Sequence, residues 1–129
     1  MSLTQMQQNR SKILALVEDL FFSAKIAEAA KRTGVLVEFA SSEQALAEKL
    51  ALKPSLIIVD LNLSSVKPLD LIARLKGDPE LNQASILGFV SHVQSELKLQ
   101  AQKAGCDNVL ARSSFSQNLP QVLKRYSGQ

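Results

Sequence analysis

The chain has 129 residues, of which 46% are hydrophobic and 21% are charged, and its formal net charge is +3. This size and balance predict one compact domain and exclude a disordered or fibrous chain. The basic residues are scattered, which argues against a nucleic-acid-binding stripe, and the longest apolar run, Ile13 to Val17, is too short to span a membrane.

The cysteine and histidine content narrows the choice of compartment and of metal chemistry. The single cysteine, Cys106, cannot form an internal disulfide, and with a single histidine, His92, the chain lacks the ligands of a usual Cys/His zinc site. No basic segment followed by an apolar one begins the chain, so we expect no export. We therefore expect a cytoplasmic protein with no membrane partner and no direct nucleic-acid partner.

Apolar segments of strand length alternate with segments of helical periodicity. Residues 1–11 are polar and predict a flexible leader, residues 12–126 one domain, and residues 127–129 a short tail. The predicted strands are Ile13–Val17, Val35–Phe39, Leu56–Val59, Ile86–Val90 and Asn108–Ala111. The first predicted helix runs from Phe22 to a stop at Gly34, and the second from a cap at Ser41-Ser42 to a stop at Lys53-Pro54. The third runs from the loop at Pro68 to Gly77-Asp78-Pro79, and the fourth passes through Leu97 and ends at Gly105. The last begins at a cap at Ser116, with Pro120 in its first turn.

Five strand–helix units of this size predict an α/β fold, a five-stranded, doubly wound parallel sheet with helices on both faces. In such a sheet, ligands bind beyond the carboxyl ends of the strands. The polar residues at these ends are Glu18 and Asp19 after the first strand, Asp60 after the third, Ser91 and His92 after the fourth, and Arg112 after the fifth.

Three carboxylates gathered at one edge repel each other, by about 4 kcal/mol per pair at 4 Å and an effective dielectric near 20. A hard divalent cation such as Mg²⁺ would offset this repulsion, and a carboxylate beside it can act as a nucleophile toward a phosphoryl group. Each acid could instead cap the following helix, as Asp19 is placed to do. We expect His92 to be a loop side chain that partly shields the site, and Cys106 to serve in packing.

Over residues 12 to 126 the chain resembles the receiver domain of bacterial two-component response regulators. The motifs that carry the resemblance are Ile13 to Asp19, Leu56 to Leu63, Val90-Ser91 and Gly105-Cys106-Asp107. The resemblance implies that Asp60 accepts a phosphoryl group from a histidine kinase or phosphotransfer protein, as a regulatory domain and not as an enzyme. It implies Mg²⁺ or Mn²⁺ on Glu18, Asp19, Asp60 and the Asn62 backbone carbonyl, with Ser91 and Arg112 on the phosphoryl oxygens. It also implies a possible homodimer through the face formed by the fourth predicted helix, the fifth strand and the last helix.

Several positions depart from this family pattern. Arg112-Ser113 stands where the family has Lys, usually followed by Pro, and Val109 stands where it usually has an aromatic switch residue. The loop after Asp60 carries Ser64 and Pro68 in place of the family's Pro and Gly, and Glu18 lengthens one metal-ligand arm.

These departures leave an alternative function open, namely a degenerate receiver that acts as a phosphorylation-independent protein-interaction module. A small flavodoxin-like enzyme or cofactor carrier is the third possibility. It is disfavoured because no Gly-rich phosphate loop follows the first strand, where an acidic pair would repel a cofactor phosphate.

Overall fold

The computed structural model describes residues 13–64, 66–91 and 95–126. Its five strands form one parallel sheet in the order β2-β1-β3-β4-β5. The strands are β1 (Ile13–Leu16), β2 (Val37–Ala40), β3 (Leu56–Asp60), β4 (Ser85–Val90) and β5 (Asn108–Ala111). The predicted α/β fold is therefore confirmed, with β1, β3 and β4 as the interior strands of the sheet.

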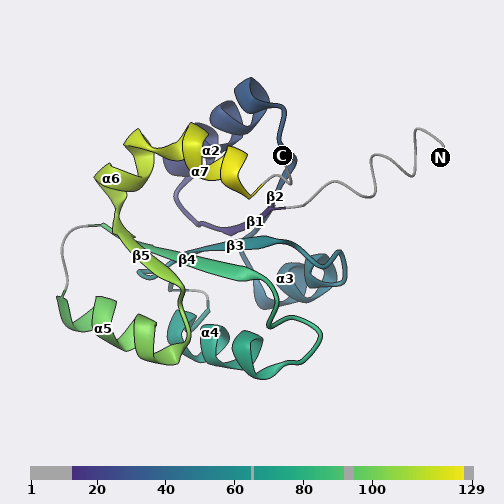
Figure 1. Ribbon diagram of the computed structural model, residues 1–129, viewed down its shortest axis with the longest axis vertical. Helices are drawn as coiled ribbons and strands as arrows, with labels where there is room; N and C mark the ends of the chain where they lie inside the picture. Colours follow the sequence, from purple (N-terminus) through teal and green to yellow (C-terminus); the bar gives the residue numbers. More distant parts are fainter. Residues whose placement is uncertain (1–12, 65, 92–94, 127–129) are drawn as a thin grey trace.

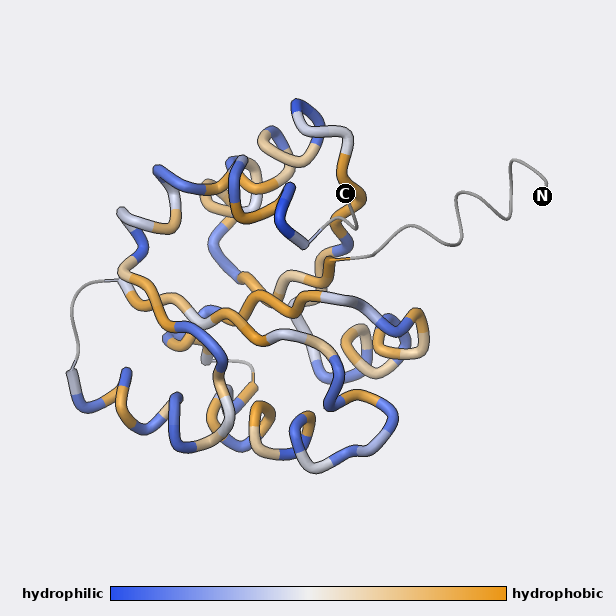
Figure 2. Tube along the Cα trace, viewed as in Figure 1, coloured by the Kyte–Doolittle hydropathy of each residue, from blue (hydrophilic) through white to orange (hydrophobic). Residues whose placement is uncertain are grey.

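Helices cover both faces of this sheet (Figure 1). The helices are α2 (Leu20–Thr33), α3 (Glu43–Leu50), α4 (Pro68–Gly77), α5 (Ser95–Ala104), α6 (Arg112–Gln117) and α7 (Leu119–Arg125). One buried cluster joins the sheet to α2, α6 and α7, and a second joins it to α3, α4 and α5. Figure 2 shows hydrophobic residues along the strands and mixed hydrophobic and polar residues along the helices, as expected for helices that each bury one side.

The interior strands are apolar on both faces because helices cover both faces. All four residues of β1, and Leu56 to Val59 of β3, are at most 1% exposed. Such continuous burial is typical of parallel strands. In the part of the chain that the structure describes, the helices are too short or too polar to cross a membrane.

The helix boundaries follow local chemistry. Asp19 caps α2 by accepting the N–H groups of Phe21 and Phe22 at 2.9 and 3.3 Å. The predicted stop at Gly34 is confirmed, since this residue has the left-handed φ of 70° that glycine tolerates. Ser42 caps α3 by accepting the N–H of Ala45 at 3.1 Å, as predicted.

The predicted last helix is wrong in one respect, because it is two helices. Ser116 lies inside α6 and does not cap a helix, and the chain turns at Asn118 before α7. Asn118 closes α6 by donating its backbone N–H and its side-chain amide to the carbonyl of Ser114. Pro120 lies in the first turn of α7, where the missing N–H costs nothing, so a second helix can begin there.

Cys106 is buried beside β4, where its thiol contacts the carbonyl of Ile86 at 3.5 Å. Burial raises the pKa of this thiol, which keeps it neutral at physiological pH. These observations agree with the predicted packing role.

Candidate functional site

The parallel register brings the polar residues to one edge of the sheet. Asp60 is the last residue of β3, and β1 pairs with β3 so that Leu16 lies beside Val59. The chain leaving β1 therefore carries Glu18 and Asp19 past Asp60. On the other side β4 pairs with β3, and β5 pairs with β4 at Val90 and Ala111, so that Ser91 and Arg112 follow directly at the same edge.

Asp60 is a partly buried carboxylate with a fixed orientation. One of its oxygens, Oδ1, accepts the backbone N–H of Asn62 at 2.9 Å. Burial raises the pKa of Asp60, and the negative charges of Glu18 and Asp19 raise it further. The Asn62 N–H and the positive charge of Arg112 oppose this rise. Burial is thus the main cause of the raised pKa of Asp60, and the charges of Arg112, Glu18 and Asp19 act on the same carboxyl group.

Asp19 serves both as the cap of α2 and as the ion-pair partner of Arg112. Its Oδ1 accepts the helix N–H groups, and its Oδ2 accepts a hydrogen bond from the Arg112 guanidinium. The Arg112 hydrogen bond is the main reason that the pKa of Asp19 is lowered, and the cap bonds add to it. The alternative cap role of Asp19 is therefore confirmed, and it coexists with a role at the site.

Arg112 points toward the start of α2. Its guanidinium carbon lies 4.6 Å from the centre of the Phe22 ring, a cation–π geometry. Phe22 in turn packs against Phe89 and Phe115, with ring centres 4.8 and 5.7 Å away. An aromatic cluster from α2, β4 and α6 therefore supports the Arg112 side chain.

Glu18 and Asn62 connect the loops around Asp60. The carboxylate of Glu18 accepts the N–H of Ser64 at 2.8 Å and its hydroxyl at 3.1 Å. The side-chain oxygen of Asn62 accepts both the N–H and the hydroxyl of Ser91, each at 3.1 Å. Asn62 thus has a side-chain role that the sequence did not reveal, in addition to the carbonyl role implied for it. His92 lies outside the described residues.

The donor set suits a hard divalent cation, because Glu18, Asp19, Asp60 and the Asn62 carbonyl are all oxygen donors. Within residues 13–64, 66–91 and 95–126, however, no three acidic, thiol or imidazole side chains gather closely enough to hold a metal ion. Asp19 is bonded to Arg112 and Glu18 to Ser64. The residues therefore fit the ion in donor type and lie at the same edge, but their side chains do not converge on one point, and those of Asp19 and Glu18 are engaged with other groups.

No protein-family model and no curated protein sequence matches the chain. Solved structures do match it. A signal receiver domain from Bermanella marisrubri is 26% identical over 89% of this chain and 96% of that chain, with a TM-score of 0.77. A response regulator from Hahella chejuensis is 18% identical over 90% and 94% of the two chains, with a TM-score of 0.80.

A response regulator protein from Burkholderia pseudomallei is 28% identical over 89% of this chain and 72% of that chain, with a TM-score of 0.70. That structure contains a phosphorylated aspartic acid, a calcium ion and citrate. The chain therefore has the fold of CheY-like response regulator receiver domains. The resemblance inferred from the motifs is therefore confirmed.

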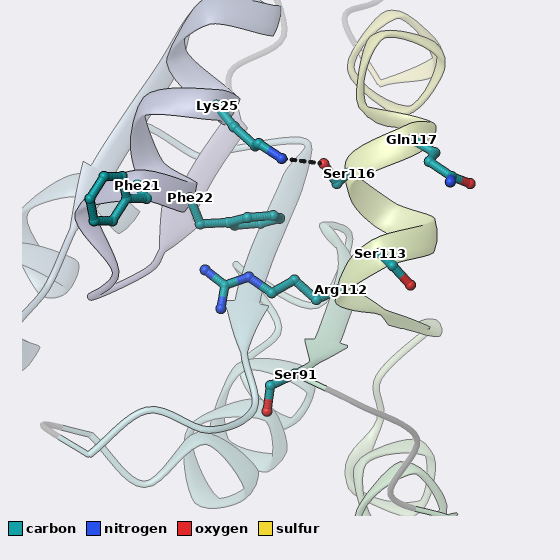
Figure 3. A pocket seen from close by; sticks show the side chains of 8 residues that line it. All are labelled: Phe21, Phe22, Lys25, Ser91, Arg112, Ser113, Ser116 and Gln117. Atoms are coloured by element: carbon teal, nitrogen blue, oxygen red, sulfur yellow. Dashed lines mark hydrogen bonds between the residues drawn. The ribbon is translucent and has the colours of Figure 1, made fainter.

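The domain also has a cavity of about 580 Å³ between α2 and α6, beside Ser91 and Arg112 (Figure 3). Phe22 and Lys25 of α2 lie along it, and Lys25 donates to the hydroxyl of Ser116 on α6 at 3.2 Å. The sequence predicted Phe22 only as the first residue of a helical segment and gave no role to Lys25. Their positions, one and two turns after the acidic pair, were the available signal for a place near the site.

Proposed function

We propose that this receiver domain acts in two-component signalling by accepting a phosphoryl group on Asp60. The observation that carries the proposal is the placement of a partly buried carboxylate at the end of a central strand. It lies between the acidic pair after β1 and the hydroxyl of Ser91 after β4. The phosphorylated aspartic acid in the Burkholderia pseudomallei relative supports this chemistry for the fold.

The reaction requires Asp60 in its ionised form. One carboxylate oxygen of Asp60 would form a bond to phosphorus while the bond from phosphorus to the donor breaks. The electron pair of the broken bond leaves with the donor, the imidazole of a phosphohistidine on a histidine kinase or phosphotransfer protein. The N–H of Asn62 fixes the plane of the carboxylate for this attack. The raised pKa of Asp60 makes its ionised carboxylate a better nucleophile than that of an exposed aspartate.

The surrounding residues would stabilise the charge on the transferring oxygens. Ser91 would donate its hydroxyl to a phosphoryl oxygen in place of its present bond to Asn62. Arg112 would add positive charge from the side of Asp19, to which its guanidinium is bonded. A divalent cation, Mg²⁺ or Mn²⁺, held by Glu18, Asp19, Asp60 and the Asn62 carbonyl would supply further positive charge to the same oxygens.

Intact-mass spectrometry after incubation with Mg²⁺ and a small phosphodonor such as phosphoramidate tests this function. We expect the wild type to gain the mass of one phosphoryl group. Asp60→Ala should gain none, whereas Asp70→Asn, which changes an exposed aspartate of α4, should behave as the wild type. An unmodified wild type, or an equal gain in Asp60→Ala, would contradict the proposal.

The second candidate is a phosphorylation-independent interaction module. Two observations favour it: Arg112 is bonded to Asp19, and Val109 is buried in β5 where an aromatic readout residue would be expected. The same mass measurement separates the two functions, because the interaction module predicts no modification of Asp60 under any donor or metal concentration.

A further inference from the structure

Arg112 brings a positive charge to the acidic edge, and two contacts hold its guanidinium there. One is the hydrogen-bonded ion pair with Asp19, and the other is the stacking contact on Phe22 at 4.6 Å. Both partners are themselves fixed, Asp19 by its cap bonds to α2 and Phe22 by its packing against Phe89 and Phe115. The pair therefore forms between positioned groups and loses less side-chain entropy than a pair between two free surface chains.

This arrangement uses both oxygens of Asp19. Oδ1 accepts the two N–H groups at the start of α2, and Oδ2 accepts the hydrogen bond from Arg112. A cation that binds Oδ1 of Asp19 must compete with the helix cap, and one that binds Oδ2 must lie beside the guanidinium of Arg112, whose positive charge repels it. Displacement of Arg112 is the easier change, because its side chain is about a third exposed and already borders the open cavity between α2 and α6.

We propose that Arg112 is an internal cation that competes with the divalent ion for Asp19, so that metal binding requires Arg112 to leave Asp19 and Phe22. The proposal deepens the proposed function and rests on it only in taking Glu18, Asp19 and Asp60 as the metal-binding edge. An arginine suits this role better than a lysine, because its planar guanidinium stacks on the ring while it bonds the carboxylate.

The coupling is reciprocal by linkage. If Arg112 lowers the affinity for the metal, then the metal loosens Arg112 from Asp19 and Phe22 by the same factor. Wild-type protein should therefore bind divalent ions weakly. Variants that release Asp19 should bind them more tightly, whether or not Asp60 is ever phosphorylated.

The test is a Mn²⁺ titration of the full chain by isothermal calorimetry, with thermal unfolding as the check on folding. Arg112→Met should tighten Mn²⁺ binding about tenfold, equal to about 1.4 kcal/mol. Arg112→Lys keeps the charge and loses the stacked plane, so it should tighten binding about threefold. Lys25→Met is the matched control: it removes one charge from the same cavity, but Lys25 is bonded to Ser116 and not to an acid of the site. Its affinity should stay within about twofold of the wild type.

A second measurement follows Arg112 itself. In a Mg²⁺ titration of the wild type by NMR, the Arg112 Nε–H signal and the Phe22 ring signals should shift with the same midpoint as the Asp19 amide. Signals of Arg112 and Phe22 that stay fixed while the Asp19 amide shifts would overturn the proposal. It would also fall if Arg112→Met bound Mn²⁺ within twofold of the wild type or not at all, or if Lys25→Met gained as much affinity.

The mass measurement keeps the two proposals distinguishable. Tighter Mn²⁺ binding by Arg112→Met, together with a wild type that gains no phosphoryl group, would support the competition and refute phosphorylation. If the wild type is phosphorylated and Arg112→Met binds Mn²⁺ with the same affinity as the wild type, phosphorylation is supported and the competition between Arg112 and the metal is refuted.

Discussion

Replacing Asp60 by asparagine should make the domain more stable at neutral pH. Burial raises the pKa of Asp60, and the charges of Glu18 and Asp19 raise it further, so folding favours the protonated carboxyl. The stabilisation from a raised carboxyl pKa is fully present below the unfolded pKa, near 3.8, and is lost as the pH rises through the folded pKa. As the pH rises, the wild type therefore increasingly bears the cost of an ionised, partly buried Asp60.

Asparagine removes this cost and keeps the oxygen that accepts the Asn62 N–H. Two like charges at 4 Å would repel by about 4 kcal/mol at an effective dielectric near 20, but solvent and Arg112 offset much of the repulsion at Asp60. We therefore expect Asp60→Asn to raise the free energy of unfolding by about 1 kcal/mol at pH 7. For a chain of 129 residues this corresponds to a rise in Tm of about 4 °C.

Urea unfolding followed by circular dichroism, repeated from about pH 4 to about pH 7, measures the difference. The gain of Asp60→Asn over the wild type should grow as the pH rises. Asp70→Asn, an exposed position on α4, should stay within about 0.5 kcal/mol of the wild type at every pH. The reasoning is refuted if Asp60→Asn is no more stable than the wild type at pH 7, or if its advantage is largest in acid.

Three further substitutions test the supports of the site by urea unfolding. Phe115→Ala empties a fully buried position of the aromatic cluster and should lower the free energy of unfolding by about 3–5 kcal/mol. Phe21→Ala is the control, because this side chain is 87% exposed, and it should lower the free energy of unfolding by less than about 0.5 kcal/mol. Equal losses in the two variants would contradict the packing described. Gly105→Ala should lower the free energy of unfolding by about 1–3 kcal/mol, because φ is +122° and the added Cβ would lie 2.5 Å from a lysine side chain of α4. Gly77 has open space around it, so Gly77→Ala should leave the free energy of unfolding unchanged or raise it. Asp19→Ala should unfold at a measurably lower urea concentration than Asp19→Ser, because serine can still cap α2. Indistinguishable midpoints would show that the cap contributes nothing.

The sequence was sufficient to predict the sheet and the edge at which the polar residues meet. Continuous apolar runs such as Leu56 to Val59 indicate strands buried on both faces, and helical segments between them require parallel pairing. Once the strands are parallel, their carboxyl ends must lie together, so the sequence alone predicts that Asp60, Ser91 and Arg112 lie at one edge.

The bonds within that edge could not be predicted from the sequence. The position of the Arg112 guanidinium depends on Phe22, Phe89 and Phe115, which come from three elements and meet only in the folded chain. The break at Asn118 is a milder case, because Pro120 was correctly expected in the first turn of a helix. What could not be foreseen was that α6 begins before this turn, directly after β5.

The central claim is that Asp60 is the residue that accepts the phosphoryl group, and its most direct test locates the modification. The protein is treated with phosphoramidate and Mg²⁺ and then with sodium borohydride, which reduces an aspartyl phosphate to homoserine, and its peptides are sequenced by mass spectrometry. The account predicts homoserine at position 60 and unmodified residues at positions 18 and 19. Conversion at another acidic residue, or none at all, would contradict it.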